Sequence, residues 1–265
     1  MMKLATILSA LHQIAPLEYA ESWDNVGLLV GSSEKNVSVV MTCLTLTPTT
    51  LAEAMERQAQ LVVCHHPIPF KPLARITSDS STGKLLLQAI EAGIAIYSPH
   101  TAWDNAKKGI NQQLADMLEL TSVRPLQNFA SGPVMDESVG VGRYGYVHGQ
   151  QPHTIEELFE RLRKHIPDIQ SKSTHDATHG VRKVGIVCGS GGSMLGLVSS
   201  RGCDAMLTGE ATYHQCLEAE SRGIAMLLIG HHASESFAMN RLAQHLQADL
   251  KEVLVCTSER ETSNF

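Results

Sequence analysis

Short apolar runs, many of them β-branched, alternate along this chain with amphipathic stretches of helical periodicity. An uninterrupted apolar run of about four to eight residues is typical of a strand buried on both faces, as in parallel sheets covered by helices. The alternation therefore predicts an α/β fold. The expected strands are 37–46, 61–64, 94–97, 139–147, 183–188, 205–208, 225–229 and 252–256, and the expected helices are 3–14, 48–58, 82–91, 105–118, 155–164, 194–200, 213–221 and 234–246.

The length of 265 residues indicates about two domains. Helical and strand periodicity breaks between Thr121 and Glu137, where Pro, Asn, Ser and Gly gather, and we expect a domain seam there. The polar stretch 171–180 is expected to be a loop. A strand, a turn, a helix and a strand ending in polar residues occur in 39–66 and again in 184–210, which suggests two similarly built α/β halves.

Charge and cysteine usage narrow the class of protein. The formal net charge is −6 and no basic run is present, so binding to nucleic acid without sequence preference is not expected. Six Cys lie in mostly apolar surroundings without a CxxC pair, as expected for buried thiols in a reducing cytosol. The apolar residues of 1–11 follow helical spacing, which argues against a signal peptide, and no apolar run approaches the ~18 residues of a membrane span. We expect a cytoplasmic protein.

Histidine is unusually frequent: the chain has 13 His, against 5 Phe, 5 Tyr and 2 Trp. Three of the expected strands end in His or carboxylate residues. His65 and His66 follow the run 61–64, His100 and Asp104 follow 94–97, and the third group, His231, His232 and Glu235, follows 226–229. The carboxyl ends of strands in open α/β sheets form the ligand crevice, so these side chains are candidates for one site.

The spacing of these residues favours a site with two metal ions. Neighbouring side chains of an extended strand point to opposite faces, so His65 and His66 suit two ions better than one. His231 and Glu235 are four residues apart and share a face if a helix begins here. A Glu can bridge two ions through its two oxygens, and mixed nitrogen and oxygen donors suit zinc, manganese or iron.

Each group also has an ordinary structural interpretation. The pair His65 and His66 could simply be polar residues at a strand end, and Asp104 could cap a helix that begins at Asn105. His232 could contact Glu235 three residues later on the same helix. We favour the dinuclear site because it accounts for all of these positions together.

Two further segments and the remaining histidines complete the candidates. The glycine-rich stretch 189–193 follows a strand and could bind phosphate or form a tight turn before a helix. Thr208, Gly209, Glu210 and His214 could line the same crevice as the histidines. The other histidines are expected to be solvated: His12, His148, His153, His165, His175, His179 and His245.

At these positions the chain closely resembles the GTP cyclohydrolase 1 type 2 family, also called the NGG-interacting-factor-like or YbgI-like family. The matching stretches are WDNVGL (23–28), VVCHHP (62–67), HTAWDN (100–105), DAMLTGE (204–210) and GHHASE (230–235). Members of this family often have Asp where this chain has Glu210, and an aromatic residue where it has His232. Both positions flank the site, where they would tune it without abolishing metal binding.

The resemblance implies a toroidal homohexamer of subunits with two interlinked α/β domains and mixed sheets, in a short form without an inserted domain. We expect a discontinuous metal-binding domain of residues 1–124 plus 225–265, and a second domain of residues 125–224. Carried over by position, the resemblance assigns two divalent ions (Zn, Mn or Fe) per subunit, with Glu235 as the bridging ligand. The implied ligands are His65, His66, Asp104, His231 and Glu235.

The function that the resemblance implies is a metal-dependent hydrolase, in which activated water opens the imidazole ring of the guanine of GTP and releases formate. His100 and His214 are the candidates for proton transfer or for orienting the metal ligands. The expected ligand is a small molecule, such as a nucleotide. Two alternatives stay open: a dinuclear hydrolase of another substrate, such as a phosphoester, and a metal-binding scaffold without enzymatic activity that acts through protein partners.

Overall fold

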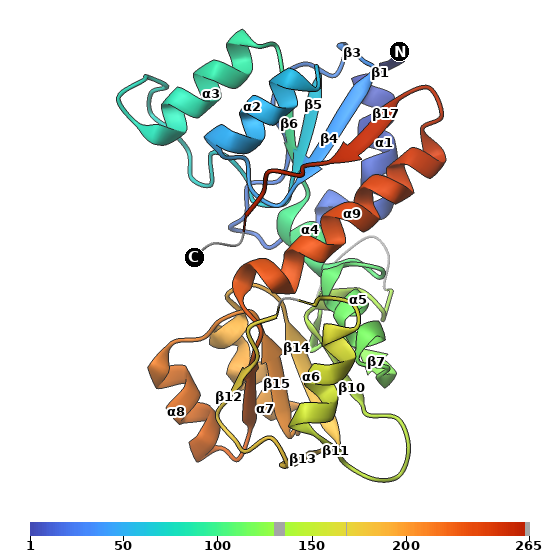
Figure 1. Cartoon of the computed structure of the whole chain (residues 1–265), viewed down its shortest axis with the longest axis vertical. Helices are drawn as coiled ribbons and strands as arrows, with labels where there is room; N and C mark the ends of the chain where they lie inside the picture. The colour runs from blue at the N-terminus through green and yellow to red at the C-terminus, as the bar shows by residue number, and fades with distance from the viewer. Residues whose placement is uncertain (130–135, 168, 263–265) are drawn as a thin grey trace. The chain divides into compact units, whose positions relative to one another are not determined.

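The computed structural model describes residues 1–129, 136–167 and 169–262 (Figure 1). The chain forms two compact units. Unit 1 contains residues 1–103 and 238–265, and unit 2 contains residues 104–237. The chain passes from one unit to the other within helices α4 (His100–Asn105) and α9 (His231–Asp249). A compact unit is not the same as an independent domain, so the domain limits expected at 124/125 and 224/225 stay a prediction.

Unit 1 is built on a five-stranded sheet in the order β17-β4-β5-β6-β2. The first four of these strands are parallel, and β2 is antiparallel to β6. Strands β1 and β3 form a separate antiparallel pair. The strands are β1 (Met2–Lys3), β2 (Gly27–Val30), β3 (Asn36–Val37), β4 (Val39–Cys43), β5 (Leu61–Cys64), β6 (Ala95–Ser98) and β17 (Leu254–Thr257), and the helices that lie wholly in unit 1 are α1 (Leu4–Ile14), η1 (Leu17–Tyr19), α2 (Pro48–Glu56) and α3 (Ser81–Glu91).

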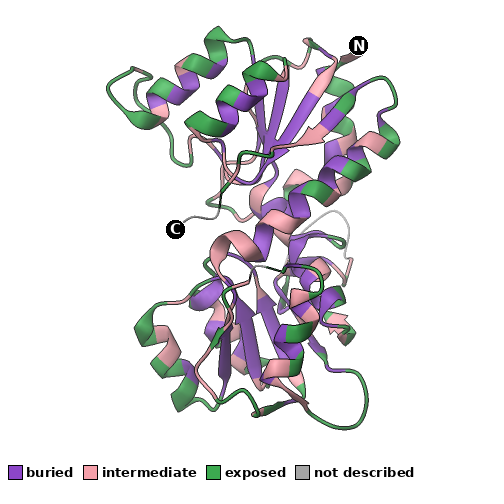
Figure 2. Ribbon diagram, in the orientation of Figure 1, coloured by how far each residue is buried: buried purple, intermediate pink, exposed green. Residues whose placement is uncertain are grey.

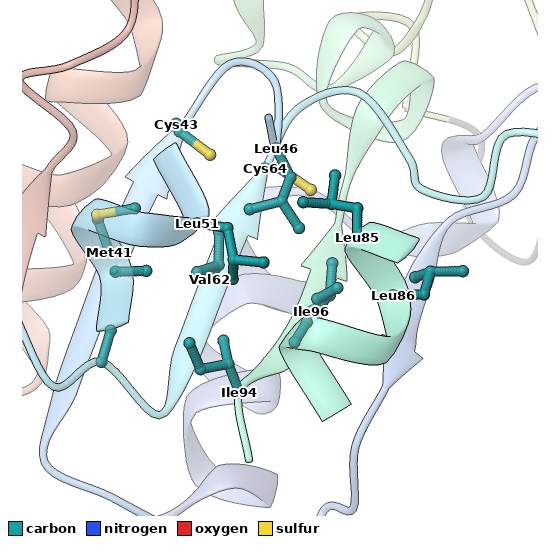
Figure 3. Packing of buried hydrophobic residues seen from close by; sticks show 13 residues of the cluster. Met41, Cys43, Leu46, Leu51, Val62, Cys64, Leu85, Leu86, Ile94 and Ile96 are labelled. Atoms are coloured by element: carbon teal, nitrogen blue, oxygen red, sulfur yellow. The ribbon is translucent and has the colours of Figure 1, made fainter. Parts of the chain in front are cut away.

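Helices cover both faces of this sheet, which is why its strands read as continuous apolar runs. Met41, Val62 and Ile96 pack on one face against residues of α2 and α3 (Figure 3). On the other face, the Thr42 hydroxyl donates a hydrogen bond to the carbonyl of Met239 in α9. Figure 2 shows the same pattern: the central strands β4, β5 and β6 are mostly buried, and α2 and α3 are exposed on their outer sides.

Unit 2 is built on a six-stranded mixed sheet in the order β12-β16-β15-β14-β10-β7. Strands β14, β15 and β16 are parallel, and the other pairs are antiparallel. Met206 and Met226 form a buried cluster with residues of α7 and α8. The strands of this sheet are β7 (Thr121–Arg124), β10 (Arg143–Tyr146), β12 (Lys172–Ser173), β14 (Lys183–Val187), β15 (Ala205–Thr208) and β16 (Ala225–Leu228), and the helices are α5 (Ile110–Met117), α6 (Ile155–Arg163), η2 (Gly191–Met194), α7 (Leu195–Ser200) and α8 (Tyr213–Ser221). Two short pairs complete the unit: β8 (Gln127–Asn128) with β9 (Gly140–Val141), and β11 (His153–Thr154) with β13 (Gly180–Val181).

The predicted α/β class with mixed sheets is confirmed, and several elements differ from the prediction. The strands expected at 37–46 and 139–147 are each two strands, β3 with β4 and β9 with β10. The helix expected at 105–118 begins only at Ile110, as α5, because Gly109 takes an extended conformation, and α4 ends at Asn105, where the expected helix was to begin. The loop expected at 171–180 contains β12, whose backbone pairs with β16. Helix α9 begins at His231, three residues before the predicted start. Of the expected seam between Thr121 and Glu137, residues 130–135 lie outside the described part of the chain.

Two general expectations can be compared with the structure directly. Among the described residues, none of the helices combines the length and the apolar character needed to cross a membrane. All six cysteines are free thiols, and four of them are buried. Cys216 and Cys256 are half-buried, so the expectation of buried thiols applies to most of the six rather than to all.

Candidate metal centre

Unit 1 brings three histidines together at the carboxyl ends of its parallel strands. His65 and His66 follow β5, and His100 opens α4 just after β6. Their ligand atoms all lie within 4.8 Å of one another. The ring of His65 is fully buried, with its centroid 5.2 Å from that of His66 and 5.1 Å from that of His100. The prediction that His65 and His66 point to opposite faces of a strand is wrong. Strand β5 ends at Cys64, so the two histidines are not part of an extended strand.

Two of these rings are oriented through Nδ1. The hydroxyl of Thr45 lies 2.8 Å from Nδ1 of His66, and the carboxylate of Asp24 lies 2.8 Å from Nδ1 of His100. A histidine that binds a metal through one ring nitrogen usually holds a carboxylate, carbonyl or water with the other. Both rings therefore have the orientation that metal binding or proton transfer through Nε2 requires.

Asp24 is a site residue that the sequence argument did not assign. Its side chain is fully buried and also accepts hydrogen bonds from the backbone amide and the hydroxyl of Thr101. Burial alone raises the pKa of Asp24, but the hydrogen bonds from His100 and Thr101 outweigh it and hold the pKa below its ordinary value. The signal was its place in the motif WDNVGL, one residue after Trp23.

His100 has a strained backbone. Its φ angle is +30°, in a region that non-glycine residues rarely adopt. Such strain costs of order 1–3 kcal/mol and persists only where the surroundings impose it, which is common at functional sites. Here the hydrogen bonds of Asp24 to both the ring of His100 and the amide of Thr101 fix the start of α4.

In unit 2, His231 lies between two carboxylates. Its Nε2 is 3.2 Å from Oε2 of Glu235 one turn later in α9, and its Nδ1 is 2.9 Å from Oε1 of Glu210, which follows β15. The contact with Glu235 is the one predicted for a helix that begins at His231. The hydrogen bond to Glu235 is the largest influence on this imidazole and, together with Glu210, raises the pKa of His231 to about 9 against the opposing effect of burial. The hydroxyl of Ser190 also donates to Glu210.

Asp104 lies inside α4 and is therefore not the helix cap that the alternative interpretation expected. Its carbonyl accepts a hydrogen bond from the side chain of Asn111. Burial, followed by the charges of Asp104 and Glu235, raises the pKa of the Cys188 thiol well above its ordinary value. Both carboxylates thus lie near one thiol, which stays protonated.

The glycine-rich stretch 189–193 forms a turn that makes room for the unit 2 carboxylates. Gly189 has a φ of +59°, and a Cβ atom there would lie 2.3 Å from Oε1 of Glu235. The amides of Gly189 and Gly191 donate to the hydroxyls of Ser234 and Thr208. These two amides are used within the protein, so the structure favours the tight-turn interpretation over phosphate binding.

The remaining candidates are His214 and His232. His214 is exposed on the first turn of α8, where its ring contacts that of Tyr213 at 5.8 Å, so its role stays a prediction. His232 is half-buried at the start of α9. None of the seven histidines expected to be solvated is buried.

The donors of each unit are of a kind that fits a divalent transition metal. The group in unit 1 consists of imidazoles, and the group in unit 2 consists of an imidazole with carboxylates. Nitrogen and oxygen donors of this kind suit zinc, manganese and iron, without a thiolate.

Comparison with known proteins finds relatives of one family that match most of the length of this chain. The family model described as Duf34/NIF3 (NGG1p interacting factor 3) matches residues 2–264. NIF3-like protein 1 of Drosophila melanogaster is 34% identical over 259 residues, which are 97% of this chain and 86% of that protein. A GTP cyclohydrolase 1 type 2 homolog of Clostridium perfringens is 33% identical over 239 residues, 88% of this chain and 87% of that protein. Among solved structures, a Bacillus cereus protein related to NIF3 has a TM-score of 0.88 at 21% identity, covering 100% of this chain and 98% of that one, and so has the same fold.

Proposed function

The chain belongs to the Duf34/NIF3 (NGG1p interacting factor 3) family, and from that premise we propose that it is a metal-dependent hydrolase of the GTP cyclohydrolase 1 type 2 kind. The observation that carries the proposal is the cluster of His65, His66 and His100, whose ligand atoms lie within 4.8 Å of one another. Two of its rings are held through Nδ1 by Thr45 and Asp24, which is the support that metal ligands and proton-transfer groups need.

We propose that five residues hold two divalent ions (zinc, manganese or iron) and that Glu235 bridges them. Bound ions would supply the Lewis acidity that lowers the pKa of a water molecule toward neutrality. The i, i+4 contact of His231 with Glu235 supports the assignment of both as ligands. The proposed ligands are His65, His66, Asp104, His231 and Glu235.

His100 is the proposed proton-transfer residue. Its Nδ1 is held by Asp24 at 2.8 Å, so Nε2 is the nitrogen that can carry a proton to or from the substrate. The buried carboxylate of Asp24 stabilises the imidazolium that forms during that transfer. His214 is the second candidate for this role.

The experiment is a formate-release assay with GTP and protein loaded with Zn²⁺, Mn²⁺ or Fe²⁺. We expect turnover that is abolished in His66→Ala and reduced about 100-fold or more in His100→Ala, because general acid–base catalysis contributes about 10²–10⁴-fold. If the metal-loaded protein releases no more formate than the His66→Ala control, the cyclohydrolase proposal is wrong. Hydrolysis of a phosphoester by the same preparation would then favour the alternative hydrolase, and no turnover of any substrate would favour a metal-binding scaffold.

Metal content and assembly are tested separately. Elemental analysis of protein purified without a His-tag is expected to give close to two ions per subunit. Protein that stays metal-free after incubation with all three metals would refute the site. We also propose a cytoplasmic homohexamer, for which analytical ultracentrifugation should give about six times the chain mass of 28.8 kDa.

A further inference from the structure

Two large aromatic side chains are exposed beside the unit 1 histidines. Trp23 is 61% exposed in the turn before β2, and Phe70 is 49% exposed in the loop after β5. Their ring centroids are 6.0 Å apart, and each lies 6.2 Å from the centroid of His100. The buried Trp103, which contacts His65 from the interior at 6.1 Å, explains the packing of that cluster, but neither exposed ring is needed for it.

The loops that carry these two rings are held by polar contacts of neighbouring residues. The side chain of Asn25 donates a hydrogen bond of 2.7 Å to the carbonyl of Pro69, so the loop that carries Trp23 is tied to the loop that carries Phe70. Asp24 also binds the ring of His100. The exposed rings and the histidine cluster therefore form one preorganised arrangement, and preorganised aromatic surfaces bind ligands at a low entropic cost.

We propose that Trp23, with Phe70 beside it, is the stacking surface for a planar heteroaromatic ring of the ligand, which it holds next to His100. The proposal rests on the proposed function of this site. A third ring cannot enter between Trp23 and Phe70, because two stacking contacts of about 3.5 Å each require about 7 Å and the centroids are 6.0 Å apart. The ligand ring therefore stacks on the exposed face of Trp23, and the ring of Phe70, inclined by 52°, borders it.

The size of the surface favours a small ligand over a protein partner. A stable protein interface buries roughly 800 Å² on each partner, whereas aromatic side chains bury about 150–250 Å² each. Two rings beside a cluster of imidazoles have the composition of a small-molecule pocket, in which aromatic groups hold the ligand and a few polar groups orient it.

The test uses the fluorescence of the two tryptophans, because Trp23 is exposed and Trp103 is buried. Guanosine and GTP are titrated into the full-length protein, with ribose 5-phosphate as the probe that lacks a base. We expect both purine probes to quench the emission, and ribose 5-phosphate to leave it unchanged. Trp23→Leu should abolish the quenching.

Affinity is measured by calorimetry in variants of the same residues. Trp23→Ala should weaken guanosine binding between about 5- and 150-fold, Phe70→Ala less, and Trp23→Phe should retain most of the affinity. Met55→Ala, which removes another exposed apolar side chain on α2, is the matched control and should bind as the wild type does. Metal content should stay unchanged in all four variants.

The outcomes separate this proposal from the hydrolase proposal. If guanosine quenches Trp23 but no formate is released, the stacking surface stands and the reaction is wrong. If formate is released and Trp23→Ala leaves KM and guanosine affinity unchanged, the stacking surface is overturned. Loss of the assembly in Trp23→Ala, with guanosine affinity intact, would also overturn it and assign the rings to contact with a second copy of the chain.

Discussion

The two units of this protein share an arrangement of parallel strands, but different side chains follow the carboxyl ends of these strands. Each has three parallel strands side by side, β4-β5-β6 in unit 1 and β14-β15-β16 in unit 2. His65, His66 and His100 follow the strands of unit 1, and Glu210 and His231 follow those of unit 2. The architecture places donors at the same edge in both units, and the sequence at that edge decides which donors they are.

The difference lies in charge. In unit 1, the imidazoles pack against one another, a neutral hydroxyl orients His66, and the carboxylate of Asp24 orients His100. In unit 2, His231 lies between two carboxylates. Imidazole donors set the preference for transition metals, whereas only carboxylates offset the charge of divalent ions. The two groups are therefore complementary, and removing one donor from each should have unequal effects.

The largest expected effect is on metal content. Glu235→Ala should lose both proposed ions, because it removes the proposed bridging ligand, whereas His66→Ala should lose about one ion per subunit and keep the other. Elemental analysis of the two variants after equilibration with excess metal measures the difference, with circular dichroism as the control for folding. Equal losses in the two variants would contradict a bridging role for Glu235.

A second comparison concerns buried charges away from the donors. In unit 2, the fully buried Arg143 donates only to neutral groups, and burial lowers its pKa to about 10. Two of its acceptors are the carbonyls of Asn105 and Ala106, which follow Asp104. Arg143→Met should remove the hydrogen bonds that this side chain donates to the two carbonyls and to its other acceptors, and destabilise the protein by ~3 kcal/mol or more. Urea denaturation measures the loss, and Arg143→Lys should recover only part of it, because a lysine cannot span the same acceptors.

Much of the fold followed from local pattern. The runs Leu61–Cys64 and Ala205–Thr208 are buried on both faces and read as strands because each residue is apolar or packs as one. The pair β12 and β16 was not predictable, because Lys172 and Ser173 are polar and form a strand only through pairing with an edge. The start of α5 at Ile110 depends on the extended conformation of Gly109. The spacing of apolar residues does not reveal that conformation, so the start could not be predicted.

For the candidate site, residue type and position in the sequence identified the proposed metal ligands. They did not identify the residues whose hydrogen bonds orient the histidine rings. His231 and Glu235 were predictable because helical spacing brings them together. Asp24 and Thr45 were not, because they lie 76 and 21 residues from the rings that they orient, and such contacts exist only in the folded chain. Variants of the residues that orient the histidine rings therefore test the comparison of the two units further.

The next largest effect is expected on metal affinity, from a change of Glu210, whose carboxylate orients His231. Glu210→Gln keeps the size of the side chain and removes its charge, so metal affinity should fall about 10- to 100-fold, while the number of ions bound at saturation stays the same. Competition with a chromophoric chelator measures the affinity. A reduced number of ions at saturating metal would mean that Glu210 is itself a ligand.

Unit 1 has its own buried charge, Glu53, which holds the C-terminal segment. Its carboxylate accepts hydrogen bonds from Ser258, Arg57 and the amides of Glu259 and Arg260. These donors outweigh burial and hold the pKa of Glu53 below its ordinary value of 4.5, so its contribution to stability is present above that pH and is lost as the pH falls through the pKa of the folded state.

Glu53→Gln should therefore destabilise the protein by ~1–2 kcal/mol at pH 7 and by less at pH 3, which is closer to the pH at which the wild-type carboxylate takes up its proton in the folded state. Urea denaturation at both pH values gives the two differences. A difference that does not shrink with acid would mean that Glu53 acts through its shape and hydrogen bonds rather than through its charge.

The smallest effect is expected at Thr45, the counterpart in unit 1 of Glu210. Its hydroxyl lies 2.8 Å from Nδ1 of His66, and its amide is held by Glu261, so the residue is fixed independently of the ring. Thr45→Val keeps the shape and removes one neutral hydrogen bond, which is worth about 1 kcal/mol, so metal affinity should fall less than tenfold. Since a hydrogen bond to a charged group is stronger than one between neutral groups, the same chelator competition should rank Glu210→Gln above Thr45→Val. The reverse order would show that the orientation of His66, and not the charge around His231, limits metal binding.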